Sequence, residues 1–475
     1  MALEKIFGRD DEINRLKACS ISNEAELVVV YGRRRVGKTF LIRQCFENQF
    51  DFDFVGAYNK STKAQLENFA VALQEQSGLI RPIPKNWADA FRQLREHLQQ
   101  TTKRGKHIVF FDEMPWMDTG RSDFLSAFEY FWNSWGSTQN HLMFIVCGSA
   151  TTWITNKLLR NKGGLYNRAT QHIYLHPFTL HETEQYLKSR RIRWNRYDIT
   201  ECYMTMGGIP FYLKQLDSTL TYTQNIDRLF FSPKAILRDE FQNLYRTLFK
   251  NAETYEQIVM ALGTKRMGLT RSQISKLTGI AQNGKLGTML ENLAQCDFIR
   301  PYNYYGSKKR GIVYQLSDYY TLFYQYFLKD KHGIDENFWT KTIDNPSRRA
   351  WAGYAFEQVC KDHISQIKHS LGISSVLSEC SSWYGKNESD GHAQIDLVID
   401  RRDRVINLCE IKFSQNPFVI DKDYDMQLRN KIATFQYATK TRKALHLTMI
   451  TTYGVKQNMY SNIVQSQATI DDLFE

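Results

Sequence analysis

The amino-acid sequence predicts an α/β protein whose first third is a parallel sheet covered by helices. Short β-branched and aromatic runs alternate there with amphipathic stretches, and their near-continuous hydrophobicity is typical of strands buried on both faces. A second α/β unit is expected after Pro346, where a helix at 350–367 precedes further strands and helices. The runs that predict the first sheet lie at 27–31, 52–55, 107–111 and 142–147.

Four domains joined by short linkers are expected along the chain. Residues 1–180 hold the first sheet, and the polar helical pattern of 181–248 is expected of a small helical lid. Residues 249–330 read as three helices followed by a hairpin, and residues 345–475 form the second α/β unit. No repeat period and no low-complexity segment stands out, so the linkers between these domains are expected to be short.

Length, composition and charge limit the class of protein. The 475 residues suggest about three domains at roughly 150 residues each, and 42% hydrophobic residues are enough for several packed cores. The 62 Lys and Arg residues outnumber the 50 Asp and Glu residues and give a formal net charge of +12. This excess favours a polyanionic partner, nucleic acid more often than membrane, although a basic protein without such a partner is the alternative.

Cysteine usage and hydropathy predict a cytoplasmic protein. The 8 cysteines are scattered without a CxxC pair, which excludes a zinc ribbon and argues against a disulfide framework. The start of the chain lacks the apolar segment of a signal peptide. No apolar run approaches the roughly 18 residues that span a bilayer, so no membrane partner is expected.

A phosphate-binding loop directly follows the first predicted strand. Residues 32–39 read Gly-Arg-Arg-Arg-Val-Gly-Lys-Thr, which is GxxxxGK[ST] between a buried strand and a helix start. Backbone N–H groups curl round a phosphate in such a loop, Lys38 can reach the β- and γ-phosphates, and the Thr39 hydroxyl can ligate Mg²⁺. The sequence thus predicts a P-loop NTPase whose nucleotide-binding residues are Gly32, Val36, Gly37, Lys38, Thr39 and Phe40.

Acidic and polar residues at later strand ends complete the predicted hydrolytic site. Asp112 ends the third strand and can hold Mg²⁺ through water, and Glu113 is placed to polarise the attacking water as a general base. Ser149 follows the fourth strand, where it could sense the γ-phosphate. Arg168 lies before a strand at 171–175 and could stabilise transition-state charge, with a surface salt bridge as the alternative.

Residues 1 to about 220 resemble the archaeal-type ATPase family, which is related to AAA+ and STAND NTPases. The segments FGRDDE, GRRRVGKT, FFDEMPW, CGSA, LYNRAT and GGIP carry the resemblance, in the family's order. The resemblance implies a preference for adenine, with the box over the base at Phe7–Glu12, Arg9 included. It also implies a sensor-like role near Gly208-Ile209-Pro210, and ATP and Mg²⁺ as cofactors.

The middle region predicts a winged helix. Helices are expected at 255–262, 270–278 and 283–293, and strands at 298–302 and 311–316 flank a basic wing. This variant of the helix-turn-helix can dock a DNA duplex, and the wing cations can contact phosphates. A winged helix also follows the ATPase in the family named above. Packing against neighbouring domains alone is the other interpretation. The wing cations are Lys308, Lys309 and Arg310.

A carboxylate-rich hairpin is expected in the last region. Strands at 394–400 and 405–413 flank a polar turn, and Asp396 and Glu410 are equally far from its centre, so they should lie opposite each other. Glu410 and Lys412 share one face of their strand. Such a group suits Mg²⁺-dependent phosphodiester hydrolysis: Asp396 and Glu410 as metal ligands and Lys412 as the group that orients or deprotonates water.

The order Glu, Asp, ExK resembles the PD-(D/E)xK fold, a restriction-endonuclease-like α/β domain, over about 350–475. The resemblance adds Glu357, on the helix before the sheet, as a third metal ligand, and Gln427 as a further candidate. Ile395 stands where the family usually has proline. Cross-strand ion pairs that only stabilise a sheet are the alternative.

Two functions stay open from the sequence. The first is a Mg²⁺-dependent ATPase coupled to DNA binding and to cleavage by the last domain. The second is an ATP-dependent signalling switch whose nuclease-like domain is not catalytic. A DNA-independent ATPase, in which the basic charge serves solubility, is a third interpretation. An oligomer is compatible with all three, because Arg168 could act within one chain or across an interface.

Overall fold

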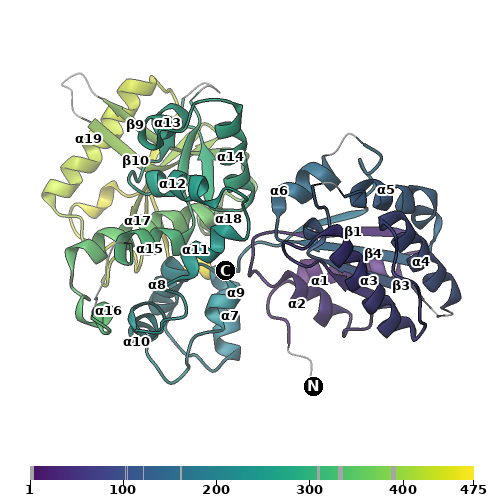
Figure 1. Cartoon of the computed structure of the whole chain (residues 1–475). Helices are drawn as coiled ribbons and strands as arrows, with labels where there is room; N and C mark the ends of the chain where they lie inside the picture. The colour runs from purple at the N-terminus through teal and green to yellow at the C-terminus, as the bar shows by residue number, and fades with distance from the viewer. Residues whose placement is uncertain are drawn as a thin grey trace. The chain divides into compact units, whose positions relative to one another are not determined.

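The computed structural model describes residues 5–101, 103, 105–120, 122–160, 163–306, 311–329, 335–386 and 392–475 (Figure 1). The chain forms two compact units, Met1–Pro177 and Phe178–Glu475. The first corresponds to the predicted sheet domain. The lid, the three-helix region and the last α/β region belong together in the second unit. Among the described residues, every helix is too short or too polar to cross a membrane.

The first unit is built on a parallel five-stranded sheet, as predicted. Its strand order is β2-β3-β4-β1-β5, so the first strand of the chain lies inside the sheet between β4 and β5. The strands have near-continuous apolar sequences because both faces of the sheet are buried. The strands are β1 (Glu26–Tyr31), β2 (Phe52–Val55), β3 (His107–Asp112), β4 (Leu142–Gly148) and β5 (Gln171–Tyr174).

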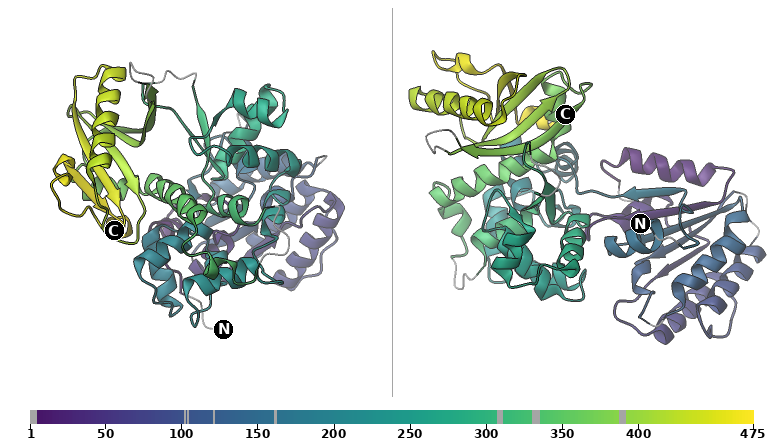
Figure 2. Two further views of the ribbon diagram at one scale, coloured as in Figure 1. Left: turned by 90° about the vertical axis from the view of Figure 1, so that its left-hand side faces the viewer. Right: turned by 90° about the horizontal axis from the view of Figure 1, so that it is seen from above.

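Helices cover both faces of this sheet (Figure 2, right). Side chains of α3 (Thr62–Ser77), α4 (Trp87–Gln100) and α5 (Phe124–Ser134) share one aromatic-rich core with alternate strand residues. The other face packs against α1 (Asp10–Ile21) and α2 (Lys38–Cys45). Short elements lie between these: 3₁₀ turns at Met114–Trp116 and Gly136–Thr138, α6 (Thr151–Ile154) and a π-helical turn at Thr155–Leu159.

Asp51, just before β2, stabilises the first unit through charged hydrogen bonds. Its carboxylate accepts from His107 Nδ1 at 3.1 Å, Lys103 Nζ at 2.9 Å and the Ile108 amide at 2.8 Å. Burial alone would raise the pKa of Asp51, but these donors outweigh it and lower the pKa from 3.8 to about 2. Because the folded state binds the proton less tightly than the unfolded state, ionised Asp51 favours folding.

We expect Asp51→Asn to lower the free energy of unfolding by about 2 kcal/mol at pH 7. The contribution of Asp51 is fully present above pH 3.8 and is lost as the pH falls through about 2. The variant should therefore lose stability less steeply than the wild type over that window. Denaturant unfolding between pH 2 and 7 measures this, with Asp11→Asn as control because Asp11 is exposed. Parallel pH profiles for wild type and Asp51→Asn would contradict the prediction.

The second unit begins with the helices predicted as a lid. Three of them begin with a side-chain cap, and Thr179 and Thr221 form capping boxes with Glu182 and Gln224. The helices are α7 (Leu180–Ser189), α8 (Arg196–Met206), α9 (Pro210–Leu213), α10 (Tyr222–Ile226), a π-helical turn (Asp227–Phe231) and α11 (Glu240–Arg246).

Three helices and a small antiparallel sheet follow. Thr270 caps the second helix, and Gly279 ends it with φ 73°. The sheet has the order β6-β8-β7. The elements are α12 (Ala252–Leu262), β6 (Leu269–Thr270), α13 (Arg271–Thr278), α14 (Gly284–Gln295), β7 (Ile299–Tyr302) and β8 (Val313–Leu316), then α15 (Tyr319–Phe327) and α16 (Phe338–Lys341).

A mixed five-stranded sheet, order β13-β12-β11-β10-β9, completes the second unit. β9, β10 and β11 are antiparallel, whereas β11, β12 and β13 run parallel. The strands are β9 (Ser378–Lys386), β10 (His392–Arg401), β11 (Val405–Lys412), β12 (Ala444–Thr451) and β13 (Ser466–Thr469). The helices are α17 (Pro346–Asp362), α18 (Ile364–Ser370), α19 (Lys422–Thr439) and 3₁₀ turns at Ser461–Ile463 and Asp471–Phe474.

The prediction of a single helix at 350–367 is wrong, because α17 ends and α18 begins on either side of His363. His363 has φ −110° and ψ 32°, outside the helical region. Its Nε2 accepts a hydrogen bond from the Leu180 amide at 3.1 Å, and its Nδ1 lies 2.8 Å from the Val359 carbonyl oxygen. A neutral imidazole satisfies both contacts only with the proton on Nδ1. The contact with Leu180 is a long-range one that local periodicity does not encode.

Contacts from three regions fix α17 in place. Arg348, near its start, pairs with Glu201 of α8 at 3.4 Å and lies 3.9 Å from the centre of the Trp339 ring. Arg300 of β7 donates to Gln358 Oε1 at 3.1 Å and pairs with Asp362. The helix that carries Glu357 is thus held by the lid helices on one side and by the small sheet on another.

Candidate functional site

The phosphate-binding loop joins β1 to α2 in the conformation that its glycines predict. Gly32 has φ 144°, and a Cβ atom there would lie 2.4 Å from the Leu175 carbonyl oxygen, so only glycine fits. Gly37 has φ 92° and directly precedes the first residue of α2. Val36, within the loop, is buried. The first amide groups of α2 therefore lie at the loop, where they can donate to a phosphate.

Lys38 is buried and folded back over the loop. Its ammonium donates to the carbonyl oxygens of Gly32 at 3.0 Å and Arg33 at 2.8 Å. These bonds place the positive charge in the middle of the loop that would surround the phosphates. Since two neutral carbonyl groups satisfy a buried ammonium poorly, a phosphate anion is a better partner for it.

The carboxyl ends of β1, β3 and β4 bring the remaining predicted residues together. Thr39 Oγ1 donates to Asp112 Oδ2 at 2.8 Å, which joins the start of α2 to the end of β3. Glu113, with φ 46°, accepts from the Ser149 amide and hydroxyl at 3.0–3.1 Å. Burial raises the pKa of Glu113, and Lys38 partly opposes the shift. A base with a raised pKa accepts a proton more readily.

This donor set fits a nucleoside triphosphate with Mg²⁺. A hydroxyl and a carboxylate are the oxygen ligands that Mg²⁺ takes beside phosphate oxygens, and Thr39 and Asp112 already hold theirs in contact. Lys38 and the amides at the start of α2 supply positive charge for the phosphates. Glu113 and Ser149 lie at the neighbouring strand ends, where water and the terminal phosphate would meet.

Three other predicted residues lie outside this cluster. Arg9 is buried with φ 66°, donates to the His176 carbonyl oxygen at 2.6 Å and pairs with Glu12 at 3.7 Å. Phe40 is 38% exposed on the first turn of α2. Arg168 is exposed on the turn before β5. The nucleotide-binding roles of Arg9 and Phe40 and the catalytic role of Arg168 stay predictions.

The hairpin of the second unit has the predicted register. β10 pairs with β11 so that Leu397 lies opposite Cys409, which places Asp396 opposite Glu410 one step further along. Asp396 Oδ2 accepts from the Ile411 amide at 3.2 Å across the pair. Both carboxylates are buried. Burial and the neighbouring Glu410 raise the pKa of Asp396.

Glu410 is bound by three side chains, two of which the sequence did not predict. Lys412 Nζ lies 3.0 Å from Oε1, and the Tyr424 hydroxyl donates to the same oxygen at 2.8 Å. Lys431 Nζ lies 2.7 Å from Oε2. Although burial opposes it, these partners lower the pKa of Glu410. Tyr424 and Lys431 come from α19, whereas the candidate Gln427 on the same helix is exposed.

Glu357 approaches the hairpin from α17. Burial raises its pKa most, and the charge of Asp396 raises it further. Lys361, one turn later, is partly buried, and its Nζ lies 3.4 Å from Gln315 Oε1 on β8. The four residues carried over from the nuclease resemblance therefore gather in one region of the unit.

This arrangement does not fit a divalent cation. Among the described residues, no group of three or more His, Cys, Asp and Glu side chains is placed to hold a metal ion. Both oxygens of Glu410 are engaged by cations or a hydroxyl, and two ammonium groups would repel an added Mg²⁺. The cavity bounded by Glu410 and Lys431 measures about 10 Å³, which leaves room for at most one water.

The predicted wing cations Lys308, Lys309 and Arg310 lie outside the described residues. What the structure does describe is the hairpin beside them: the Tyr305 amide donates to the Ser382 carbonyl oxygen of β9 at 2.9 Å. The Tyr305 ring also packs at a tilt against Phe435 of α19, with ring centres 5.1 Å apart. The segment that follows β7 is thereby attached to β9 and α19 of the last α/β region.

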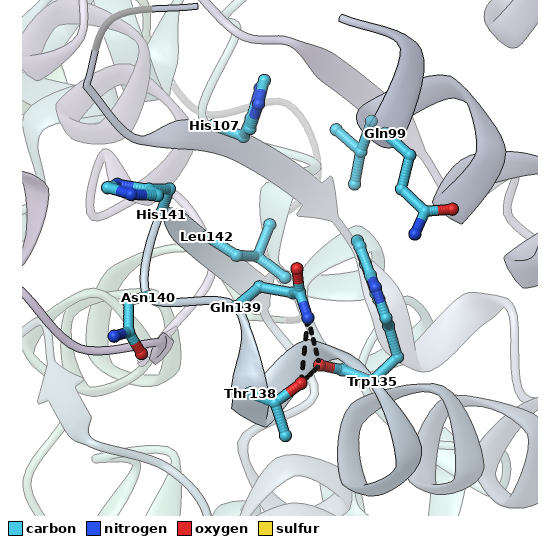
Figure 3. A pocket seen from close by; sticks show the side chains of 9 residues that line it. Gln99, His107, Trp135, Thr138, Gln139, Asn140, His141 and Leu142 are labelled. Carbon is cyan, nitrogen blue, oxygen red and sulfur yellow. Dashed lines mark hydrogen bonds between the residues drawn. The ribbon is translucent and has the colours of Figure 1, made fainter. Parts of the chain in front are cut away.

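A pocket of about 380 Å³ lies at the amino ends of the strands of the first sheet, opposite the phosphate-binding loop (Figure 3). His107 and Leu142, the first residues of β3 and β4, line it together with Gln99, Trp135 and Asn140. The phosphate-binding loop follows the carboxyl end of β1, and all strands of this sheet are parallel. The pocket is therefore separate from the nucleotide site.

Two family models match the chain. Residues 6–216 match an ATPase domain predominantly from Archaea, and residues 319–426 match a family described as archaeal and bacterial proteins of unknown function. The first match confirms the archaeal ATPase resemblance and contains the whole cluster around the phosphate-binding loop. The second spans α15 to the start of α19, including Glu357, Asp396, Glu410 and Lys412.

A related protein and several solved structures are similar to large parts of the chain. An uncharacterized protein of Methanocaldococcus jannaschii is 23% identical over 412 residues, 85% of this chain and 87% of that protein. A Walker-type ATPase of Pyrococcus abyssi has a TM-score of 0.48 and 17% identity, covering 67% of this chain and 96% of that one. Cdc6p of Pyrobaculum aerophilum has a TM-score of 0.33 and 13% identity, covering 68% and 94%. The family match over residues 6–216 makes this region similar to archaeal ATPase domains and supports ATP binding at the loop.

Proposed function

We propose that the protein is a Mg²⁺-dependent ATPase whose second unit binds nucleic acid. The observation that carries the ATPase part is the meeting of Lys38, Thr39, Asp112 and Glu113 at the carboxyl edge of the first sheet. Bound Mg²⁺, held by Thr39 and Asp112, would neutralise charge on the phosphates.

Each residue of this cluster has a distinct role in hydrolysis. Lys38 transfers its hydrogen bonds from the loop carbonyls to the phosphates and stabilises negative charge there. Glu113 orients the attacking water and accepts its proton. Ser149 holds Glu113 in place through its amide and hydroxyl, so a terminal phosphate that attracts the Ser149 hydroxyl would also change the position of the base.

The nucleic-acid part rests on the second unit. We propose that α12–α14 with β6–β8 form a winged helix, because their order and antiparallel sheet suit that fold. Lys285 and Thr288 are exposed near the start of α14, the third helix of this group. In a winged helix that helix enters the major groove.

ATP turnover with and without DNA tests the proposal. We expect Mg²⁺-dependent hydrolysis that changes severalfold when duplex DNA is added, and calorimetric binding of ATP that Mg²⁺ strengthens. A rate of ATP hydrolysis that DNA does not change at low salt would support the DNA-independent ATPase. Absence of Mg²⁺-assisted ATP binding would end the proposal altogether.

Lys285→Ala should weaken duplex binding about 3- to 10-fold and reduce the salt dependence of binding by about one phosphate contact. The reason is the exposed position of Lys285 on the first turn of α14, whose cap Asn283 orients the helix start. Fluorescence anisotropy with a labelled duplex at several salt concentrations measures both quantities. Lys63→Ala is the matched control, since Lys63 is exposed on α3 of the first unit. Equal losses in both variants would contradict the prediction.

A second candidate function is an ATP-dependent switch whose nuclease-like domain is not catalytic. The observation that favours it is the engagement of both Glu410 oxygens by Lys412, Lys431 and Tyr424. DNA cleavage by Asp396, Glu410 and Lys412 stays a prediction. Incubation of DNA with the full chain and Mn²⁺ distinguishes the two: cleavage that Lys412→Ala abolishes supports the nuclease, and intact DNA supports the switch.

A further inference from the structure

The pocket at the amino ends of β3 and β4 has the size and lining of a small-molecule site (Figure 3). Its volume of about 380 Å³ lies within the range of roughly 300–1,000 Å³ that ligand pockets occupy. Leu98, Trp135 and Leu142 supply apolar surface, and amide and imidazole side chains supply polar groups. The residues that line the pocket include none of the hydrolytic cluster, so a ligand here would be separate from ATP.

The turn after α5 holds Trp135 in a fixed position beside the pocket. A Cβ atom at Gly136, the next residue, would lie 2.9 Å from the Trp132 ring, so only glycine fits the turn there. The Trp135 ring packs against Phe131 with ring centres 5.2 Å apart, and Trp135 is 7% exposed. A ring held this way can pack against a ligand without losing conformational freedom, which favours binding.

Gln139 presents an oriented hydrogen-bond acceptor. Its Nε2 donates to the Trp135 carbonyl oxygen at 3.3 Å and to Thr138 Oγ1 at 2.9 Å. Because a carbonyl oxygen can only accept, the amide nitrogen must face the turn, and Oε1 points away from it (Figure 3). Among the described residues, no donor is bonded to this oxygen. Gln139 Oε1 is therefore available to a ligand.

His107 presents a second acceptor. Its Nδ1 lies 3.1 Å from Oδ1 of Asp51, whose low pKa of about 2 keeps the carboxylate ionised at neutral pH. An ionised carboxylate only accepts, so Nδ1 carries the proton, and Nε2 of the neutral ring is left as an acceptor. Gln99 and Asn140 are exposed at the rim, where their amides can donate or accept.

These acceptors and the nearby charges select a neutral ligand that donates hydrogen bonds. An anion would bring further lone pairs against the two acceptors. A cation would meet Lys103, which binds Asp51 at 2.9 Å, and Arg95, whose guanidinium lies 5.6 Å from the centre of the Trp135 ring. Two cations against the one carboxylate of Asp51 disfavour additional positive charge. A planar, uncharged ring with N–H donors fits both conditions.

We propose that this pocket binds the amino-bearing base of a free nucleoside, with Trp135 packing against the base and Gln139 Oε1 and His107 Nε2 accepting its hydrogen bonds. Adenine and cytosine each carry an exocyclic amino group, which supplies two N–H donors on a planar ring. The site goes beyond the proposed function, because it lies apart from the phosphate-binding loop and uses none of its residues.

Calorimetry of the full chain with cytidine and with uridine tests the proposal. The loop is first saturated with Mg²⁺ and a non-hydrolysable ATP analogue, and the pH is set above neutrality so that His107 is uncharged. Cytidine carries two N–H donors in its amino group, whereas uridine carries one N–H between two carbonyl oxygens. We expect cytidine to bind about 10-fold more tightly than uridine. Equal affinities, or no binding of cytidine at about millimolar concentration, would overturn the proposal.

Variants of the lining locate the ligand. Gln139→Met keeps the length of the side chain and removes the acceptor, so it should weaken cytidine binding about 10-fold and reduce the preference over uridine. Gln99→Trp places an indole at the pocket from an exposed position and should abolish binding of both nucleosides. Gln74→Met is the matched control, because Gln74 is exposed on α3 of the same unit. Cytidine affinity unchanged in both pocket variants would overturn the site, and melting temperatures identify any loss that comes from unfolding.

Two further measurements distinguish other sources of the base. A short cytidine oligonucleotide that binds more tightly than cytidine, and that Gln139→Met weakens, would assign the site to a nucleic-acid strand and overturn the assignment to a free nucleoside. Cytidine binding that the ATP analogue abolishes would place the nucleoside at the phosphate-binding loop and overturn the separate site. Lys38→Ala should leave cytidine binding unchanged, so a failure of the proposed ATPase function and a failure of this site are distinguishable.

Discussion

Lys38→Ala should abolish measurable ATP hydrolysis and weaken ATP binding by at least about 10-fold. The variant removes the buried ammonium that now contacts the Gly32 and Arg33 carbonyl oxygens in the middle of the phosphate-binding loop. The phosphates thereby lose the charge-assisted bonds that Lys38 provides, both in the bound state and in the transition state. A charge-assisted bond of this kind contributes about 1.5–3 kcal/mol, which is about 10- to 100-fold in affinity.

Calorimetry with ATP and Mg²⁺ measures the affinity, and release of phosphate measures turnover. Lys63→Ala serves again as control, because it removes an exposed lysine of the same unit. Unchanged turnover in Lys38→Ala would show that hydrolysis takes place elsewhere or belongs to a contaminant. Lost turnover with unchanged affinity would restrict Lys38 to the transition state and would revise the expected binding role.

The first sheet and its phosphate-binding loop could be predicted because their signals are local. Each strand is a continuous apolar run, and the glycines and Lys38 follow the first run without interruption. Parallel strands then bring Asp112 and Ser149 to the same edge as the loop by topology alone. The hydrogen bonds between Ser149 and Glu113 could not be predicted, since they depend on the left-handed backbone at Glu113.

The hairpin shows how far spacing can predict a site. The alternation of β10 and β11 around one short turn fixed the register, so the approach of Asp396 and Glu410 followed from counting. Tyr424 and Lys431 were missed because they come from α19, and the packing of a helix on a sheet is not encoded in the distance along the chain. The signal that could have identified them is their spacing of seven residues, which places Tyr424 and Lys431 on one face of the helix.

The sequence also could not predict that the lid helices, the small sheet and the last α/β region form one compact unit. Contacts such as Arg348 with Glu201 and Leu180 with His363 join segments more than a hundred residues apart. Both pairs are buried, and neither has a periodic pattern around it. The same contact at His363 divided the helix that periodicity had predicted as continuous.

Glu113→Gln should lower the rate of ATP hydrolysis by about 100-fold or more while ATP affinity stays within about 3-fold. Glutamine has the shape of glutamate and can still accept a hydrogen bond from the Ser149 amide, so the geometry at the end of β3 is preserved. What is lost is the carboxylate that accepts the proton of water. Single-turnover hydrolysis and calorimetry separate the two effects, because only the first requires a base.

Ser149→Ala is the informative partner variant for this prediction. It removes the hydroxyl that donates to Glu113 and leaves in place the hydrogen bond of 3.1 Å from the Ser149 backbone amide to Glu113. If Ser149 positions the base, the hydrolysis rate falls less than in Glu113→Gln, and the double variant is no slower than Glu113→Gln alone. Independent losses that multiply in the double variant would assign Ser149 a separate contact with the terminal phosphate. An unchanged rate in Glu113→Gln would exclude it as the base and leave Asp112, which the structure already commits to Thr39, as the acidic residue of the site.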